Sequence, residues 1–218
     1  MEDALEDLDD RGLVDTAVTN RDAEVAAGCR MLQVAAVWAD RHPADGLFHQ
    51  RTPLAMAGER TMRFGGEGTP DVAEFAPAKL GLEIGLNPAQ SQALVADALD
   101  LRHRLPRLWS RVRHGNVPAW QTRRIAYRTR TLSLEQAGLV DERLAPFVGK
   151  VSAGRLENKI MAELIRVDPE GFARAAEKAA TDRDVRLRRP NEYGQQEVSM
   201  LLDAPRRGRR VRHGRSRG

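Results

Sequence analysis

The sequence contains few of the residues on which several kinds of site depend. Its 218 residues include a single cysteine, Cys29, so a disulfide or a cysteine-based zinc cluster within one chain is excluded. Cys29 stands in the apolar run VAAGCRMLQVAAVW, and we expect it to be a small buried side chain rather than a reactive thiol. Lysine is also scarce, because only four of the 35 basic residues are lysines and the rest are arginines.

Long hydrophobic runs are missing as well. No segment approaches the roughly 18 consecutive apolar residues of a membrane-spanning helix. The chain begins with MEDALEDLDD, and this acidic start is the opposite of the basic start of a signal peptide. With 41% hydrophobic and 30% charged residues, the composition is typical of a globular protein. We therefore expect a cytoplasmic protein without membrane contact.

The basic character of the chain is local. The formal net charge is +4, but the last fifteen residues, APRRGRRVRHGRSRG, contain seven arginines and no acid. The remaining body has 28 basic and 31 acidic residues and is slightly acidic. A basic balance often indicates a nucleic-acid partner, so the arginines that matter must be located within the chain.

Hydrophobic spacing and helix-capping residues predict a mainly α fold, a multi-helix domain with a long loop near residues 43–69. Examples of the capping signals are Asn87 followed by Pro88, and Ser133 with Gln136 three residues later. The predicted helices cover residues 22–41, 70–84, 87–103, 106–114, 118–130, 133–146, 152–167 and 168–180. We expect a short strand or turn at RTMRF within the loop, and a short C-terminal β-hairpin over residues 185–202.

Three regions follow from this pattern. Residues 1–19 are acidic and weakly patterned, and form either a short helix or a disordered lead. Residues 20–203 form the helical domain. Residues 204–218 form a basic, disordered tail. The tail is either an arm that binds phosphate groups or the product of a GC-rich gene read out of frame.

The helices from GEGTPDVAEFAPAKLGLEIGLNPAQSQALVADALDLRHRLPRLW through LSLEQAGLVDERLAPFVGKVSAGRLENKIMAELIRVDPEGFARAAEKAATDRDVRL to VSMLLDAP carry a family resemblance. Over roughly residues 22–205, their order and spacing resemble the actinobacterial 13E12-repeat proteins, which carry the domain of unknown function 222. In that family the helical domain commonly precedes an HNH endonuclease module. The resemblance implies a role in DNA transactions of mobile or repeated elements.

The residues of an HNH nuclease are not grouped in this sequence. Such a module needs a histidine that activates water, further side chains that hold a divalent metal, and often paired cysteines for zinc. The five histidines, at positions 42, 49, 103, 114 and 213, show no such grouping. We therefore expect a chain without the nuclease module, with no catalytic residue, no metal site and no cofactor. No small-molecule substrate is evident, and a homodimer is left open.

Residues 101–130, LRHRLPRLWSRVRHGNVPAWQTRRIAYRTR, contain nine arginines and no carboxylate. Helical spacing places Leu108, Val112, Ile125 and Ala126 on inward faces and the arginines on the opposite faces. Guanidinium groups bind phosphate in a bidentate geometry, so this surface is our candidate for DNA contact. The candidate residues are Arg107, Arg111, Arg113, Arg123, Arg124, Arg128 and Arg130.

A second interpretation gives these arginines a structural role. They could pair with acids elsewhere in the chain, which include Asp97, Asp100, Glu135, Asp141 and Glu142. We expect the aromatic residues of the same stretch, Trp109, Trp120 and Tyr127, to be packing anchors in the core rather than platforms for base stacking. The chain would then be a helical protein-interaction or dimerisation domain.

The segment AKLGLEIGLNPAQSQAL has the outline of a DNA-binding helix-turn-helix, in which the first helix ends at Gly85 and a tight turn holds Leu86. Asn87, Gln90 and Gln92 would be exposed on the second helix, where amides can pair with adenine. However, Ser91 occupies a position that usually holds valine or isoleucine, so a plain helical hairpin is the alternative. The GGEG at residues 65–68 lacks the strand and the lysine of a phosphate-binding loop and predicts a flexible loop.

Overall fold

A computed structural model of the chain describes residues 5–44, 60–181, 184–187, 189–190 and 192–201. The chain divides into two units, Met1–Asp168 and Pro169–Gly218, and each unit is described separately. The predicted basic tail at 204–218 and most of the predicted loop at 43–69 lie outside the described residues.

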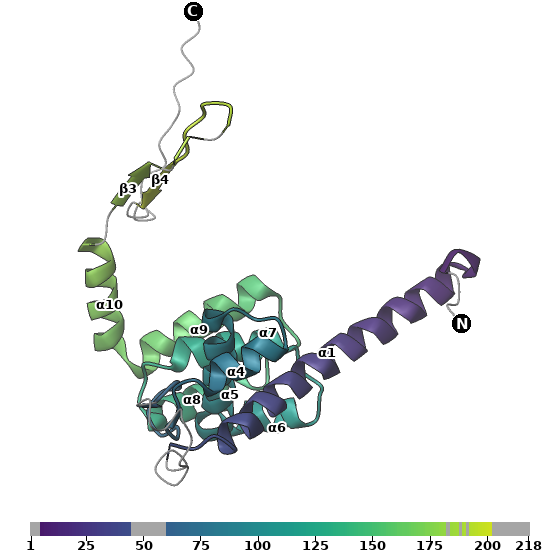
Figure 1. Cartoon of the computed structure of the whole chain (residues 1–218), viewed down its shortest axis with the longest axis horizontal. Helices are drawn as coiled ribbons and strands as arrows, with labels where there is room; N and C mark the ends of the chain where they lie inside the picture. Colours follow the sequence, from purple (N-terminus) through teal and green to yellow (C-terminus); the bar gives the residue numbers. More distant parts are fainter. Residues whose placement is uncertain (1–4, 45–59, 182–183, 188, 191, 202–218) are drawn as a thin grey trace, which may run out of the picture. The chain divides into compact units, whose positions relative to one another are not determined.

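Helices dominate the first unit (Figure 1). Its helices are η1 (Leu5–Asp7), α1 (Asp10–Asp40), α4 (Ala76–Glu83), α5 (Pro88–Arg104), α6 (Pro106–Arg113), α7 (Ala119–Thr129), α8 (Leu134–Leu144) and α9 (Ala153–Val167). Its two short strands are β1 (Thr61–Met62) and β2 (Val72–Ala73), which pair antiparallel. The predicted mainly α fold is confirmed.

Helix α1 is twelve residues longer at its start than the predicted helix, because it begins at Asp10 and not at Asp22. The side chain of Asp9 caps it by accepting a hydrogen bond of 2.7 Å from the Gly12 amide. Hydrophobic spacing located the helix only where it is buried, since Cys29 is its first buried residue. The preceding turns, which we predicted as part of an acidic lead, are helical without a buried face.

The predicted helix over residues 70–84, which Thr69 would cap and Pro70 would open, starts in the wrong place. The Thr69 hydroxyl donates a hydrogen bond of 2.8 Å to the Gly66 carbonyl inside a tight turn and does not cap a helix. Strand β2 follows this turn, and helix α4 begins only at Ala76, with Pro77 in its first turn. The strand that we placed near RTMRF is present as β1.

The predicted helices downstream agree with the structure within a few residues. Reciprocal capping boxes start α5 at Asn87 with Gln90, and α8 at Ser133 with Gln136. Gly115, whose φ is +68°, follows α6 in the left-handed conformation that favours glycine. Local capping chemistry therefore fixes most helix boundaries in this part of the chain.

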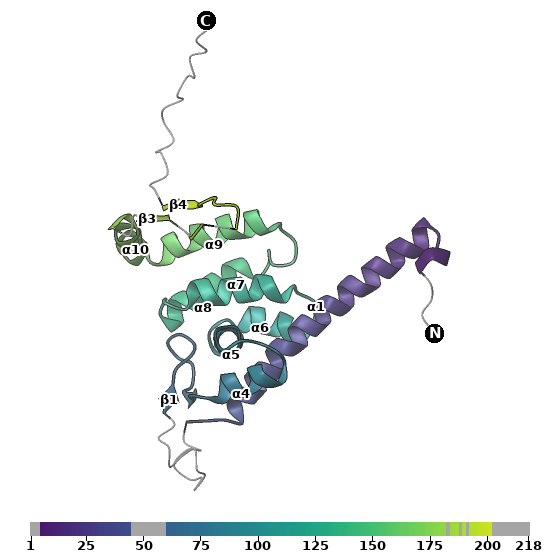
Figure 2. The ribbon, with the colours of Figure 1, turned by 45° about the horizontal axis from the view of Figure 1, so that its top comes forward.

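Helix α5 forms the centre of the first unit. Every residue from Leu94 to Leu101 is buried, including two aspartates, Asp97 and Asp100. Figure 2 shows α5 almost along its axis, with α1, α4, α6 and α8 around it. The inward faces predicted for α6 and α7 are confirmed, because Leu108, Val112 and Ile125 are buried in the same core. The fold thus places two acidic side chains at its most buried helix.

The second unit contains α10 (Pro169–Thr181) and the strands β3 (Asp184–Leu187) and β4 (Val198–Leu201). The two strands are antiparallel, with Val185 opposite Met200 and Leu187 opposite Val198. Among the described residues of both units, no helix combines the length and the apolar character needed to cross a membrane.

Candidate nucleic-acid interface

Six of the seven candidate arginines have partners within the first unit, and these partners lie outside the arginine-rich stretch itself. Two partners are the buried carboxylates of α5. Arg123 donates from Nε to Asp97 at 2.8 Å, and Arg130 donates to Asp97 at 2.7 Å and to Asp100 at 2.8 Å. The interpretation that these arginines pair with acids elsewhere in the chain is correct for both.

A further arginine, which we did not single out, completes this network. Arg104 is fully buried one turn after Asp100 and contacts it at 3.1 Å. Its Nη2 also donates to the backbone carbonyls of Thr129 and Leu132, at 3.1 and 2.6 Å. These bonds connect α5 to the end of α7 and to the turn before α8. We call Asp97, Asp100, Arg104, Arg123 and Arg130 the arginine network.

The glycine-rich turn at residues 65–68 packs directly on this network. The Gly66 amide donates a hydrogen bond of 2.7 Å to Asp100, and Gly66 is buried. A Cβ at position 66 would lie 2.2 Å from Nη1 of Arg104 and 2.4 Å from the Arg130 carbonyl oxygen. Only glycine permits this approach. The GGEG segment is therefore a packed part of the structure, which the sequence interpretation as a flexible loop missed.

Helix α9 supplies a partner that the sequence analysis did not consider. Glu157 accepts hydrogen bonds from Nε of Arg124 at 2.9 Å and from Nε of Arg128 at 3.1 Å. The hydrogen bond from Arg124 is the main reason that the pKa of Glu157 lies below its ordinary value. The two arginines therefore join α7 to α9 across a half-exposed surface.

The arginines of α6 bind the end of α8. Arg107 pairs with Glu142 at 2.9 Å, and Arg111 donates from Nη1 to the carbonyls of Ala145 and Val148 at 2.6 and 2.8 Å. Those carbonyls follow the last turn of α8, where unpaired carbonyl groups favour a cation. Both interactions hold α6 against α8.

Two carboxyl groups in this region have raised pKa values. Burial raises the pKa of Asp97, and the hydrogen bonds from Arg123 and Arg130 oppose that shift. Burial also raises the pKa of Asp141, which accepts hydrogen bonds of 2.7 and 3.0 Å from the first amides of α6, those of Arg107 and Leu108. Asp141 thus caps α6 from a neighbouring helix.

Arg113 differs from the other candidates. It is exposed at the end of α6, and no carboxylate or carbonyl partner lies near it among the described residues. Lys150 and Arg155 are also exposed and without such a partner in the described part of the chain. Hydrogen bonds bring their segments together, because Gln121 bonds Gly149 and Val151, and Arg111 bonds Val148. We call Arg113, Lys150 and Arg155 the basic cluster.

The aromatic residues do not all lie where we expected them. Trp109 packs against the core, as predicted. Trp120 and Tyr127 are exposed, with 53% and 59% of their surface accessible, so their prediction as core anchors is wrong. They lie seven positions apart on α7, whose inward face is filled by small and β-branched residues such as Ile125 and Ala126.

The predicted helix-turn-helix segment forms α4, a turn and α5. Asn87 and Gln90 are exposed, but each bonds the backbone amide of the other, at 2.9 and 3.1 Å. Gln92 is exposed, whereas Ser91 is buried against Gly81, where an added Cβ would lie only 2.6 Å from the serine Cβ. Because α5 is buried at every residue from Leu94 to Leu101, the arrangement is closer to a helical hairpin with a tight crossing.

The described residues contain no group of three or more histidine, cysteine, aspartate or glutamate side chains that could hold a metal ion. Cys29 is buried and donates to the Val117 carbonyl at 3.0 Å, and burial raises the pKa of its thiol. Neither a curated protein nor a solved structure matches the chain. A family model described as a domain of unknown function matches residues 49–209.

Proposed function

Because the chain belongs to the family of the domain of unknown function 222, we propose that it is a DNA-associated helical module of an HNH-endonuclease-type protein. The resemblance to actinobacterial 13E12-repeat proteins supports a cytoplasmic role with mobile or repeated elements. The module supplies DNA binding and no catalytic group. Purified protein should therefore not nick DNA, with or without a divalent metal, and metal-dependent cleavage by a clean preparation would overturn this assignment.

The basic cluster is the observation that carries the proposal. Arg113, Lys150 and Arg155 are exposed, stand in or close to segments that the hydrogen bonds of Arg111 and Gln121 join, and have no carboxylate partner among the described residues. Arginines that already bind carboxylates, such as Arg124 and Arg130, must give up those bonds before they can bind phosphate. Unpaired cations carry no such cost and release counterions when they bind DNA. The proposed phosphate contacts are therefore moved from the predicted arginine surface to this cluster.

Salt titration of binding to unrelated DNA duplexes tests the proposal. The change of Arg113, Lys150 and Arg155 together to glutamine should weaken binding. It should also reduce the slope of log K against log salt by about one unit for each phosphate that the variant no longer neutralises. Seven arginines of the C-terminal tail also contribute to the slope, so the comparison must use chains with the same tail.

A matched control removes the same charge from a different place. Arg60, Arg63 and Arg166 are exposed, and each pairs with a carboxylate, in Glu74, Asp71 and Glu163 respectively. Their combined change to glutamine alters the net charge equally but should leave the slope nearly unchanged. Equal reductions of the slope in the two triple variants would mean that binding depends on net charge alone and not on the basic cluster.

The internal pairing of six candidate arginines favours a second function, a helical protein-interaction or dimerisation domain with no nucleic-acid role. In this case the arginines serve only to hold α6 and α7 against α5, α8 and α9. The same titration separates the two functions. Absence of binding to duplex DNA at low salt, where phosphate contacts are strongest, would favour the second.

A further inference from the structure

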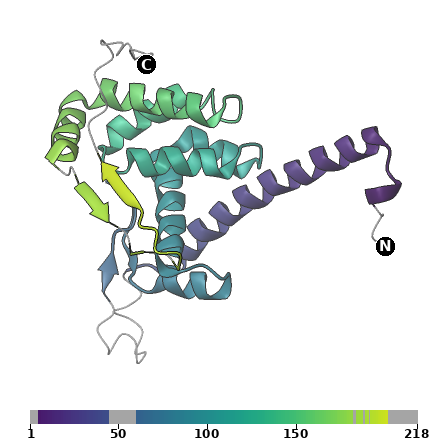
Figure 3. The ribbon, with the colours of Figure 1, turned by 90° about the horizontal axis from the view of Figure 1, so that it is seen from above.

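The first half of α1 extends beyond the other helices of the first unit, as Figures 1 and 3 both show. No residue of α1 before Cys29 is buried, although the exposed side chains include Leu13, Val14 and Val18. An isolated helix of this kind is marginal in water, because most helical stability comes from packing of one face. Such a segment needs a partner surface.

One stripe of α1 has the spacing of a helix-pairing seam. We call it the α1 seam, and it consists of Asp10, Leu13, Ala17, Asn20, Glu24, Ala27, Met31, Val34, Trp38 and Arg41. Its members alternate at intervals of three and four residues, as positions a and d of a coiled coil do. Leu13, Met31 and Val34 are 42%, 38% and 44% exposed, so the first unit leaves most of the seam uncovered. Trp38 is the exception, because it packs partly against the core and donates from Nε1 to the Ala76 carbonyl at 2.8 Å.

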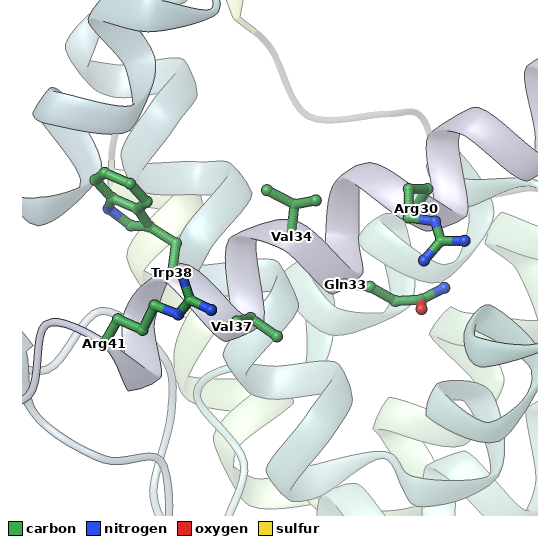
Figure 4. A pocket seen from close by; sticks show the side chains of 6 residues that line it. All are labelled: Arg30, Gln33, Val34, Val37, Trp38 and Arg41. Carbon is green, nitrogen blue, oxygen red and sulfur yellow. The ribbon is translucent and has the colours of Figure 1, made fainter.

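The second half of this stripe borders a shallow groove. The groove has a volume of about 350 Å³ and is lined by Arg30, Gln33, Val34, Val37, Trp38 and Arg41 (Figure 4). Two valines and the tryptophan give it an apolar floor, and an arginine lies at each end. An apolar helix with acidic residues at matching positions would complement it.

We propose that the groove binds the first half of α1 from a second copy of this chain, so that two α1 helices pair antiparallel. A two-fold axis between positions 24 and 27 aligns every seam residue of one copy with a seam residue of the other. Leu13 then meets Trp38, Ala17 meets Val34 and Asn20 meets Met31. The same register places Asp10 opposite Arg41 and Glu24 within one turn of Arg30.

The charges of the seam favour this orientation. Asp10, Glu24, Arg30 and Arg41 have no ion-pair partner among the described residues of their own chain. In the antiparallel pair each acid meets a base, and the symmetry repeats both ion pairs. A parallel pair would instead place Asp10 beside Asp10 and Arg41 beside Arg41, and like charges oppose such pairing. At 31 residues, α1 is about 46 Å long, which allows an extended interface.

The mass of the full chain in solution is the first test. Sedimentation over a range of concentrations should show a dimer, at twice 24.2 kDa, and not only a monomer. Val34→Lys should raise the dimer dissociation constant by about tenfold or more, because it places an unpaired charge in the interface. Val18→Lys is the matched control, since Val18 is also exposed but lies off the seam. A monomer at all concentrations, or equal effects of both variants, would overturn the proposal.

Engineered cysteines test the orientation. In the antiparallel pair position 20 meets position 31, so the double variant Asn20→Cys, Met31→Cys should form a disulfide-linked dimer under mild oxidation, whereas neither single variant should. The native Cys29 is buried and should not interfere. Linkage by either single variant would indicate a parallel or nonspecific association and would overturn the antiparallel register. Circular dichroism should show equal helix content in all three.

Charge exchange tests the register independently. Asp10→Arg alone and Arg41→Asp alone should each weaken the dimer, because every symmetric pair then contains two like charges. The double variant should restore it, which simple loss of α1 stability would not do. Failure of the double variant to recover the dimer, with normal helix content, would overturn the proposed register.

Discussion

The arginine network and the first half of α1 use charged residues in opposite ways. In the network, Asp97 and Asp100 are buried and bind Arg104, Arg123 and Arg130 through hydrogen bonds between 2.7 and 3.1 Å long. Along the first half of α1, charged side chains are exposed and have no ion-pair partner in the described residues. Charged side chains thus hold helices together in the arginine network, whereas those in the first half of α1 are available to bind a partner.

Removal of a network carboxylate should have the largest effect. Asp100→Ala leaves Arg104 buried without its carboxylate and deprives the Gly66 amide of its acceptor. We expect the free energy of unfolding to fall by about 3–5 kcal/mol, as for other buried pairs from which one partner is removed. Asp22→Ala, in the exposed half of α1, should change it by no more than about 0.5 kcal/mol. Urea denaturation measures the free energy of unfolding of both variants. Similar losses for Asp100→Ala and Asp22→Ala would contradict the proposed difference between the arginine network and the first half of α1.

The close approach of the glycine-rich turn should give the next largest effect. In Gly66→Ala the added Cβ meets Arg104 and the backbone of Arg130. We therefore expect the free energy of unfolding to fall by about 1–3 kcal/mol. Gly138→Ala is the matched control, because an added Cβ there meets nothing within 4 Å. Because Gly138 lies inside helix α8, Gly138→Ala should raise the free energy of unfolding by up to about 1 kcal/mol. Thermal denaturation compares the two variants. A melting temperature that Gly66→Ala leaves unchanged would contradict the close packing of the turn on the arginine network.

The smallest effect concerns the half-exposed pairs of Glu157. Its pKa is lowered in the folded protein, so its contribution to stability is complete above pH 4.5, the ordinary value, and is lost as the pH falls through the folded value. Glu157→Gln should therefore lower the free energy of unfolding by up to about 1 kcal/mol at pH 7, and this difference should shrink as the pH falls below the ordinary pKa of the glutamate. Asp97 and Asp141 shift in the opposite direction, so the comparison must be between the variant and the parent at each pH. A difference that does not depend on pH would contradict the assignment.

Local signals in the sequence predicted more of the fold than of the candidate site. The capping box of Ser133 and Gln136 and the glycine after α6 involve residues that are neighbours along the chain, so they could be read directly. The helix predicted from Pro70 failed because a distant partner, the network at Asp100, holds the preceding turn in another conformation. Proline and threonine alone do not reveal such an interaction.

The partners of the arginines could not be predicted from the sequence for a related reason. Arg128 and Glu157 lie 29 positions apart, and only the packing of α7 against α9 brings them together. The sequence correctly predicted which residues of α7 face inward. It did not indicate whether each arginine on the outward face contacts solvent or another helix. The exposure of Trp120 was missed because bulky aromatic rings favour cores in general, whereas the buried face of α7 consists of Gln121, Thr122, Ile125, Ala126 and Thr129.

The central claim is that the arginines of α6 and α7 hold the helices together, and its most direct test is the combined change of Arg107, Arg111, Arg124 and Arg128 to glutamine. Their bonds to Glu142, Glu157 and the carbonyls after α8 predict a loss of about 2–4 kcal/mol and a melting temperature lower by several degrees. DNA affinity at a temperature where the variant remains folded should stay close to that of the parent. An unchanged melting temperature with a large loss of DNA affinity would contradict the account and return these arginines to the DNA surface.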